Sequence, residues 1–186
     1  MKNVECKYFN ICGGCSLLNV DYDRQLKLKQ QQVVDALSEF NINTKVEKTV
    51  GMYYPYKYRN KVHLAIREVK GKTEVGFFEE NSNRIVDVDD CLLHDVWVKQ
   101  LITITREYVK KYRISAYNKR KESGTLKYVV ARKLDNEIMV TIVATTPNFA
   151  GTEWYYTQLK NAFNNVSFYI NVNTRTDNAV FEDKKF

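Results

Sequence analysis

The sequence contains few of the residues that interrupt or terminate regular structure. Its 186 residues include seven glycines and two prolines, with no internal repeat and no low-complexity linker. We therefore expect one domain, or one domain with a small appendage. No apolar run approaches the ~20 residues of a membrane-spanning helix, which predicts a soluble protein without a membrane partner. With only His63 and His94, no Ser/His/Asp arrangement is discernible.

Cysteine is also scarce, and its placement is the most informative feature of the chain. Cys6, Cys12 and Cys15 lie together near the start, and Cys91 follows after 75 further residues. The opening residues carry no apolar segment of the kind that directs secretion. We therefore expect a cytoplasmic protein with reduced thiols, which argues against structural disulfides.

Four thiolates are the ligand count of a cubane iron–sulfur cluster or of an all-cysteine zinc site. Structural zinc usually takes two close pairs, whereas a triplet with a remote single cysteine is commoner for iron–sulfur ligation. Gly13 and Gly14 would let the backbone approach the sulfurs closely. A redox Cys-x-x-C pair is a further reading, although such pairs normally follow a strand and only eleven residues precede Cys12.

The charge of the chain indicates a polyanionic partner. The formal net charge is +7 and the isoelectric point is near 9.1, which most simply points to nucleic acid. The charge is polarised, because residues 106–122 hold seven Lys/Arg and two Glu whereas residues 79–95 are acidic.

Hydrophobic periodicity predicts an α+β fold, with a mostly antiparallel sheet, flanking helices and an N-terminal Cys-rich cluster loop. The apolar stripe of the second helix is expected to run from Val96 through Leu101, Ile104 and Tyr108 to Tyr112. Helices are predicted at about 22–40, 94–112 and 152–163, and strands at about 44–50, 58–69, 74–79, 84–88, 125–133, 137–145, 166–173 and 178–181. Because the strands at 58–88 form a meander, we expect them to return Cys91 to the other three cysteines.

In order along the chain, several segments resemble bacterial 23S ribosomal RNA (uracil-5-)-methyltransferases of the RumA type. After the cysteine triplet and a Gln/Lys-rich helix, the matching segments are Pro55-Tyr-Lys-Tyr-Arg-Asn-Lys61, Gly76-Phe-Phe-Glu-Glu-Asn-Ser82, Val86-Asp-Val-Asp-Asp-Cys91, Gly124-Thr-Leu-Lys-Tyr-Val-Val-Ala-Arg132 and Asn171-Val-Asn173.

The resemblance implies a [4Fe–4S] cluster on Cys6, Cys12, Cys15 and Cys91. It also implies that residues 1–20 with 89–92 are cluster-binding segments and that residues 21–186 form a central domain that helps hold ribosomal RNA. In the full-length family, a C-terminal domain binds S-adenosylmethionine. A cysteine there attacks uracil C6, the methyl group goes to C5 and a base removes the C5 proton, with the target base flipped out.

The chain departs from that family pattern at its end. It stops at Phe186, holds no G-x-G turn suited to S-adenosylmethionine, and has no fifth cysteine to act as nucleophile. We therefore expect the methyl-donor domain to be absent and the chain to be a fragment that has no catalytic residue and is inactive by itself. We expect the chain to be a monomer, and we name a separate C-terminal catalytic half as a candidate partner.

RNA recognition requires cations for phosphates and flat side chains for unstacked bases. Alternation places Arg59, Lys61, His63 and Arg67 on one face of a strand, which makes this face the first candidate. The neighbouring strands add further candidates, Phe77, Phe78 and Arg84. Since adjacent strand residues point to opposite faces, one of the two phenylalanines is expected in the core.

Three interpretations therefore remain at the sequence level. The first is the cluster-bearing, RNA-binding portion of a uracil-5-methyltransferase. The second is a zinc- or iron–sulfur-stabilised RNA-binding module without a catalytic partner. The third is a small iron–sulfur electron carrier, against which the basic charge and the large sheet–helix body argue.

Overall fold

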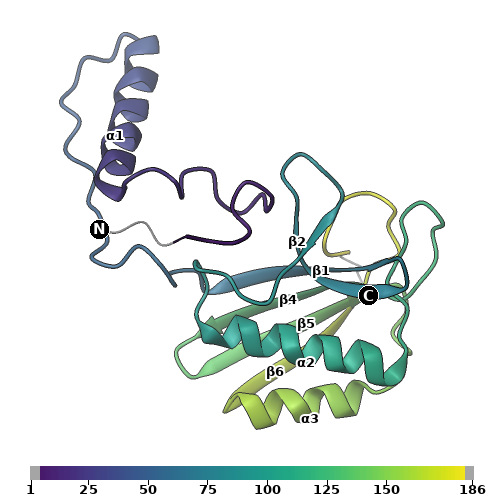
Figure 1. Ribbon diagram of the computed structural model, residues 1–186. Coiled ribbons are helices and arrows are strands. Elements are labelled where there is room, and N and C mark those ends of the chain that lie inside the picture. Colours follow the sequence, from purple (N-terminus) through teal and green to yellow (C-terminus); the bar gives the residue numbers. More distant parts are fainter. Residues whose placement is uncertain (1–4, 183–186) are drawn as a thin grey trace.

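The computed structural model describes residues 5–182 and shows a six-stranded sheet with helices on one of its faces (Figure 1). The strand order is β3-β2-β1-β4-β5-β6, and all pairs are antiparallel except β5–β6. The elements are α1 (Tyr22–Glu39), β1 (Lys61–Val69), β2 (Lys72–Phe78), β3 (Ile85–Asp87), α2 (Val96–Tyr112), β4 (Leu126–Leu134), β5 (Glu137–Ala144), α3 (Thr152–Ala162) and β6 (Asn165–Val172). The predicted α+β class with a mostly antiparallel sheet is confirmed.

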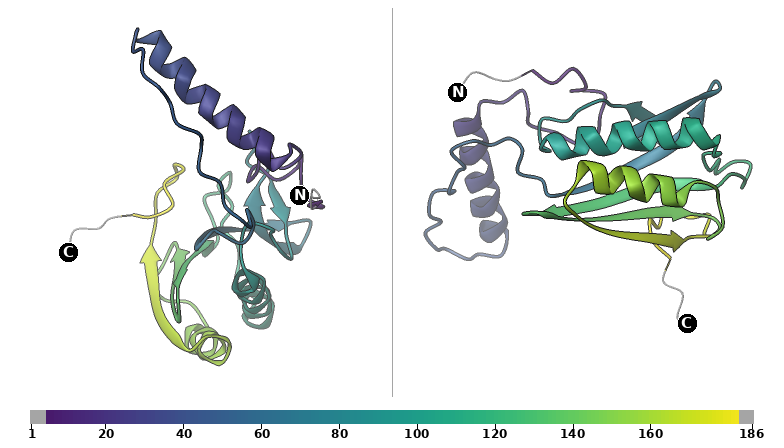
Figure 2. Two further views of the ribbon diagram at one scale, coloured as in Figure 1. Left: turned by 90° about the vertical axis from the view of Figure 1, so that its left-hand side faces the viewer. Right: turned by 90° about the horizontal axis from the view of Figure 1, so that it is seen from below.

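The core lies between the sheet and the two helices α2 and α3, which lie side by side beneath it (Figure 2). On β1, Val62, Leu64 and Ile66 are buried against these helices, whereas Lys61 and His63 are exposed on the opposite face. The alternation expected from the sequence is therefore present. Because α2 and α3 pack on the same face of the sheet, the other face has no helical layer.

Tight backbone geometry fixes the hairpin and the edge of the sheet. Lys70 and Gly71 both have positive φ, 51° and 77°, which suits the two-residue turn between β1 and β2. Gly76 lets β3 approach β2, because a Cβ there would lie 1.9 Å from the carbonyl oxygen of Val86. The edge strand that precedes Cys91 therefore depends on a glycine.

Helix α1 stands apart from the sheet, with the segment after it running back along its side (Figure 1). It has no buried residue, so its side chains are not part of the buried core. The strand predicted at about 44–50 is wrong, because this segment is held by α1 and not by a neighbouring strand. Gln30 donates to the carbonyl of Val46 (3.0 Å), and the Met52 N–H donates to Tyr22 Oη (2.8 Å).

The strand predicted at about 178–181 is likewise absent from the structure. Its place is taken by a loop that the fully buried Asn173 side chain organises. The Asn173 amide donates to the carbonyls of Ala179 and Val180, both at 2.9 Å. Within residues 5–182, the helices fall short of the length and apolarity that crossing a membrane requires.

Candidate cofactor site and nucleic-acid interface

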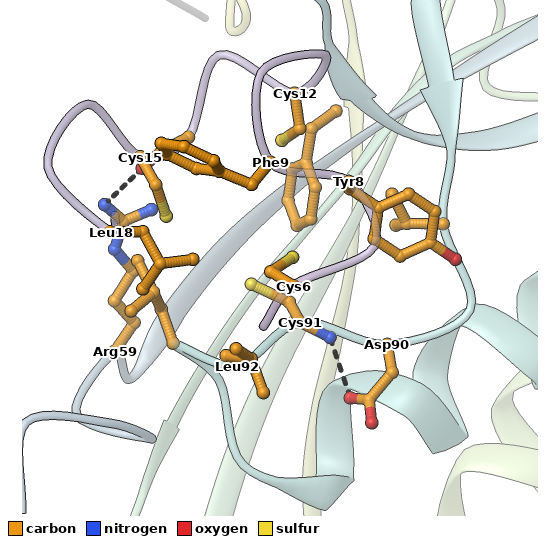
Figure 3. Close-up of a pocket in the computed structure, with 14 residues that line it drawn as sticks. Cys6, Tyr8, Phe9, Cys12, Cys15, Leu18, Arg59, Asp90, Cys91 and Leu92 are labelled. Atoms are coloured by element: carbon orange, nitrogen blue, oxygen red, sulfur yellow. Dashed lines mark hydrogen bonds between the residues drawn. The ribbon is translucent and has the colours of Figure 1, made fainter. Parts of the chain in front are cut away.

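Two segments that are far apart in the sequence bring all four cysteines to one cavity. The N-terminal loop is held on β2, where the Gly13 N–H donates to the carbonyl of Phe78 (3.0 Å) and Cys12 forms a bridge with Glu79. The chain then leaves β3 and reaches Cys91. Figure 3 shows the four thiol groups around the same hollow, which Cys6, Cys12, Cys15 and Cys91 all line.

Tyr8 attaches this loop to the other cysteine-bearing segment. Its hydroxyl accepts a hydrogen bond from the Asp89 N–H (2.9 Å), and Lys7 forms an ion pair with the Asp89 carboxylate (3.1 Å). The remaining wall of the cavity is mainly apolar, formed by Tyr8, Phe9, Leu18, Phe77, Val88, Leu92 and Leu93. This lining partly shields the sulfurs, since all four cysteines are half-buried.

Backbone amides point at two of the sulfurs. The Gly14 amide lowers the pKa of the Cys12 thiol, and the amides of Leu93 and His94 lower that of the Cys91 thiol, each against the rise that burial causes. A Cβ at Gly14 would lie 3.4 Å from Cys12 Sγ. Amide donors and close backbone approach are the surroundings that stabilise cluster-bound thiolates, so the residues present fit a [4Fe–4S] cluster.

Burial raises the pKa of the Cys12, Cys15 and Cys91 thiols, and the Arg59 guanidinium opposes that rise. Within the part of the chain that the structure describes, no three His, Cys, Asp or Glu side chains form a group that could hold a metal ion. The four thiols line the same hollow. A single zinc ion requires four ligands that meet at about 2.3 Å from it, whereas each cysteine of a cubane binds a different iron, and metal analysis distinguishes the two.

Arg59 lies at this cavity and not on the face where alternation placed it. Its Nη2 donates to the carbonyl of Gly14 (3.1 Å), and its own N–H donates to the carbonyl of Leu93 (2.9 Å). Residue 59 lies before the start of β1. It pairs with His94 in an isolated parallel β-bridge. The structure therefore separates Arg59 from the other candidate RNA-binding residues.

The other three β1 candidates lie on the face of the sheet that α2 and α3 leave open. Strand pairing sets Lys61 opposite Arg132 and Ala65 opposite Tyr128. Lys61, His63 and Arg132 are exposed, and Arg67 is half-buried. Burial and the neighbouring Lys61 lower the pKa of His63, so at neutral pH this side chain offers a ring and not a charge.

Arg67 lies beside two aromatic rings on this open face. Its guanidinium is 5.8 Å from the ring centre of Phe78 and 5.6 Å from that of Tyr128, and the two rings are 6.4 Å apart. Arg67 also donates to the carbonyl of Ile66 (2.8 Å), which fixes its position. These three side chains line a groove of about 1440 Å³.

The remaining two candidate residues, Phe77 and Arg84, make other contacts. Phe77 points to the helical side, where it packs on the core and stacks on His94 with ring centres 5.8 Å apart. Arg84 makes two hydrogen bonds to the Glu79 carboxylate, at 2.7 and 2.9 Å. The structure thus places Lys61, His63, Arg67 and Phe78 on the open face, where Arg84, paired with Glu79, also lines the groove. Phe77 does not join them there.

Several residues of the open face were missed from the sequence. Tyr128 and Arg132 belong to β4, and extending the alternation of β1 across the strand pair would have found them. Lys127 could not be found in this way, because a bulge in β4 lies at this point. It is buried, with Nζ 4.3 Å from the ring centre of Tyr117 and hydrogen-bonded to the carbonyl of Arg175 (2.6 Å).

The chain is similar in sequence to proteins named RNA methyltransferases. No protein-family model matches the chain. An uncharacterized RNA methyltransferase of Halalkalibacterium halodurans is 35% identical over 184 residues, which cover 96% of this chain and 40% of the relative. An uncharacterized RNA methyltransferase of Clostridium tetani is 33% identical over 179 residues, or 94% of this chain and 39% of the relative.

Among solved structures, the chain resembles the tRNA (uracil-54, C5)-methyltransferase of Pyrococcus abyssi in complex with S-adenosyl-L-homocysteine. The TM-score is 0.69 at 28% identity, covering 92% of this chain and 39% of that enzyme. The chain therefore spans about two-fifths of the length of the proteins it matches. Homologues of this chain are named RNA methyltransferases, and over nearly its whole length the chain shares its fold with part of such an enzyme.

Proposed function

We propose that this chain is the RNA-holding, cluster-bearing portion of an S-adenosylmethionine-dependent RNA uracil-C5 methyltransferase, with 23S ribosomal RNA as its substrate. The observation that carries the proposal is the open sheet face, where Arg67 and Lys127 line a groove with the rings of Phe78 and Tyr128. The same face carries the exposed cations Lys61 and Arg132. The named relatives support RNA methylation. The archaeal neighbour supports uracil C5 as the methylated atom, and the segments matching the RumA type favour 23S over transfer RNA.

The side chains of the open face divide between two tasks. Lys61 and Arg132 are exposed cations on paired strands, and we assign them to phosphates of the RNA backbone. Phe78 and Tyr128 present rings on which unstacked bases would lie. A uridine must leave its stack before its C5 can be methylated, so a face that binds single-stranded RNA beside the target keeps that region open.

The four cysteines would hold a [4Fe–4S] cluster whose task is structural. Methyl transfer to uracil requires no electron, whereas a cluster on Cys6, Cys12, Cys15 and Cys91 closes a long loop between the N-terminal segment and the end of β3. S-adenosylmethionine, when bound, supplies the methyl group. We assign its binding, and the catalytic cysteine, to the part of the relatives outside the aligned two-fifths of their length.

The cluster is tested by measuring iron, acid-labile sulfide and zinc per chain after anaerobic purification. We expect four iron and four sulfide per chain, the content of one cubane cluster, with loss of both in Cys91→Ser. Stoichiometric zinc without sulfide would overturn the cluster and favour the zinc-stabilised module. Reversible reduction at a physiological potential would favour the electron carrier.

The RNA role is tested by the fluorescence anisotropy of labelled RNA. We expect the chain to bind single-stranded fragments of 23S ribosomal RNA more tightly than a duplex of the same length. Equal affinity for transfer RNA would remove the preference for 23S, and no binding to any RNA would contradict the proposal. Methyl transfer from labelled S-adenosylmethionine by this chain alone would contradict the assignment of chemistry to the remainder of the enzyme.

A further inference from the structure

We propose that Arg59 is a positioning residue of the cysteine site, which joins the two cysteine-bearing segments to each other. This inference rests on the cysteine site described under the proposed function and goes beyond it, because it assigns the assembly of that site to a residue that is not a ligand. The sequence pattern grouped Arg59 with the candidate RNA-binding cations, whereas in the structure Arg59 lines the cysteine cavity.

The backbone of Arg59 belongs to the Cys91 side of the site. Its N–H donates to the carbonyl of Leu93 (2.9 Å), and the Lys57 N–H donates to the carbonyl of Leu92 (2.9 Å). Arg59 also forms a parallel bridge with His94. The position of the Arg59 Cα is therefore set by the three residues that follow Cys91.

The side chain of Arg59 belongs to the N-terminal side. Its Nη2 donates to the carbonyl of Gly14 (3.1 Å), and Gly14 lies between Cys12 and Cys15. A planar guanidinium with several fixed donors holds such a carbonyl in one orientation, which a lysine cannot do equally well. One residue thus has its backbone on one cysteine-bearing segment and its side chain on the other (Figure 3).

The charge of Arg59 suits the same place. It is a cation in the lining of a mainly apolar cavity that holds four thiols. Thiolates in apolar surroundings require a nearby positive charge. Arg67 and Arg84 cannot substitute for it, because the former lies beside the rings of Phe78 and Tyr128 and the latter is paired with Glu79.

The first test uses the metal-free chain, so that its outcome does not depend on which metal binds. Hydrogen exchange is followed for residues 12–18 in the native protein, in Arg59→Gln and in Arg59→Lys. We expect exchange to accelerate about tenfold in Arg59→Gln, as the loss of a charge-assisted hydrogen bond would give, and less in Arg59→Lys. Arg120→Gln, at an exposed arginine outside the lining of the cysteine cavity, is the matched control and should leave exchange in 12–18 unchanged. Unchanged exchange in Arg59→Gln overturns the inference.

The second test follows the loss of iron from the anaerobically purified protein to a chelator. We expect Arg59→Gln to release iron several-fold faster than the native chain, with Arg59→Lys between them and Arg120→Gln at the native rate. Equal rates in the native chain and Arg59→Gln count against the positioning role. A native chain without iron contradicts the cluster assignment alone, and the exchange measurement then decides on Arg59.

Discussion

At the scale of single residues, Gly76 links the sheet to the cysteine site. A Cβ at this position would lie 1.9 Å from the Val86 carbonyl oxygen in β3, and β3 leads directly to Cys91. We expect Gly76→Ala to lower the free energy of unfolding by about 3 kcal/mol, because the two strands must move apart. The measurement is urea denaturation followed by circular dichroism.

Gly71→Asn is the control for this substitution. Gly71 lies at the β1–β2 turn with φ of 77° and has no atom within 4 Å of a built Cβ, and asparagine tolerates this conformation. Its free energy of unfolding should stay within about 0.5 kcal/mol of the native value. A Gly76→Ala protein as stable as this control would show that β3 does not require the close approach.

Side-chain direction could be predicted from the sequence only where the strand itself was regular. Alternation required one of Phe77 and Phe78 to enter the core, and Phe77 does so. The same rule failed for Arg59, because alternation holds only within a strand and β1 begins at Lys61. The position of Arg59 depends on hydrogen bonds to Leu93 and Gly14, which are distant in sequence and leave no local pattern.

At the scale of elements, Arg106 ties α2 to β3 beside the cysteine site. Its guanidinium donates to the Asp87 carboxylate (2.5 Å), to Asp89 (2.8 Å) and to the carbonyl of Val88 (2.9 Å). Burial disfavours the Asp87 carboxylate, but hydrogen bonds from Lys72, Val75 and Arg106 outweigh it and hold its pKa below the usual range. The helix and the edge strand are therefore joined by an ion pair that is lost when the Asp87 carboxylate is protonated.

We expect Asp87→Asn to lower the free energy of unfolding by about 1.5 kcal/mol at pH 7. Because the native pKa of Asp87 is depressed, its contribution is present above the unfolded pKa, about 3.9, and is lost as the pH falls through the native value. The difference between native protein and variant should thus shrink below about pH 4. Urea denaturation at pH 7, 5 and 3 measures it, with Asp35→Asn on α1 as the charge-matched control. A difference that does not change with pH would contradict this origin.

The elements themselves were largely predictable, and the failures have physical causes. The helices and central strands lie within a few residues of their predicted bounds, because periodicity records burial. The buried face of α2 differs from the predicted apolar stripe, because Trp97, Val98 and Ile102 are buried whereas Val96 is exposed. Segments 44–50 and 178–181 have strand-like composition, but the hydrogen bonds they receive come from side chains of α1 and from Asn173.

At the scale of the whole molecule, the sheet separates two tasks. One face is covered by α2 and α3 and supplies the core, while the other is free of these helices and carries the cations and rings (Figure 2). The cysteine-bearing loop lies at the end of β2, where the Gly13 N–H donates to the Phe78 carbonyl and the Phe78 side chain lines the groove. The cysteine loop is thereby linked to a ring of the open face through one residue.

This division predicts how RNA binding responds to salt. Each phosphate neutralised on single-stranded nucleic acid contributes about −0.7 to the slope of log K against log salt concentration. The double variant Lys61→Gln/Arg132→Gln removes two cations of the open face, so its slope should be about 1.4 shallower than that of the native chain. The measurement is the fluorescence anisotropy of a labelled single-stranded RNA between about 50 and 200 mM salt.

The matched control is Lys99→Gln/Lys110→Gln, which removes two exposed cations from α2 on the opposite side of the sheet. Both double variants lower the net charge from +7 to +5, so a purely long-range attraction would weaken equally in each. Contact with phosphates on the open face requires the first pair to reduce the slope and the second to leave it nearly unchanged. Equal slopes in the two variants would show that the open face does not hold the RNA backbone.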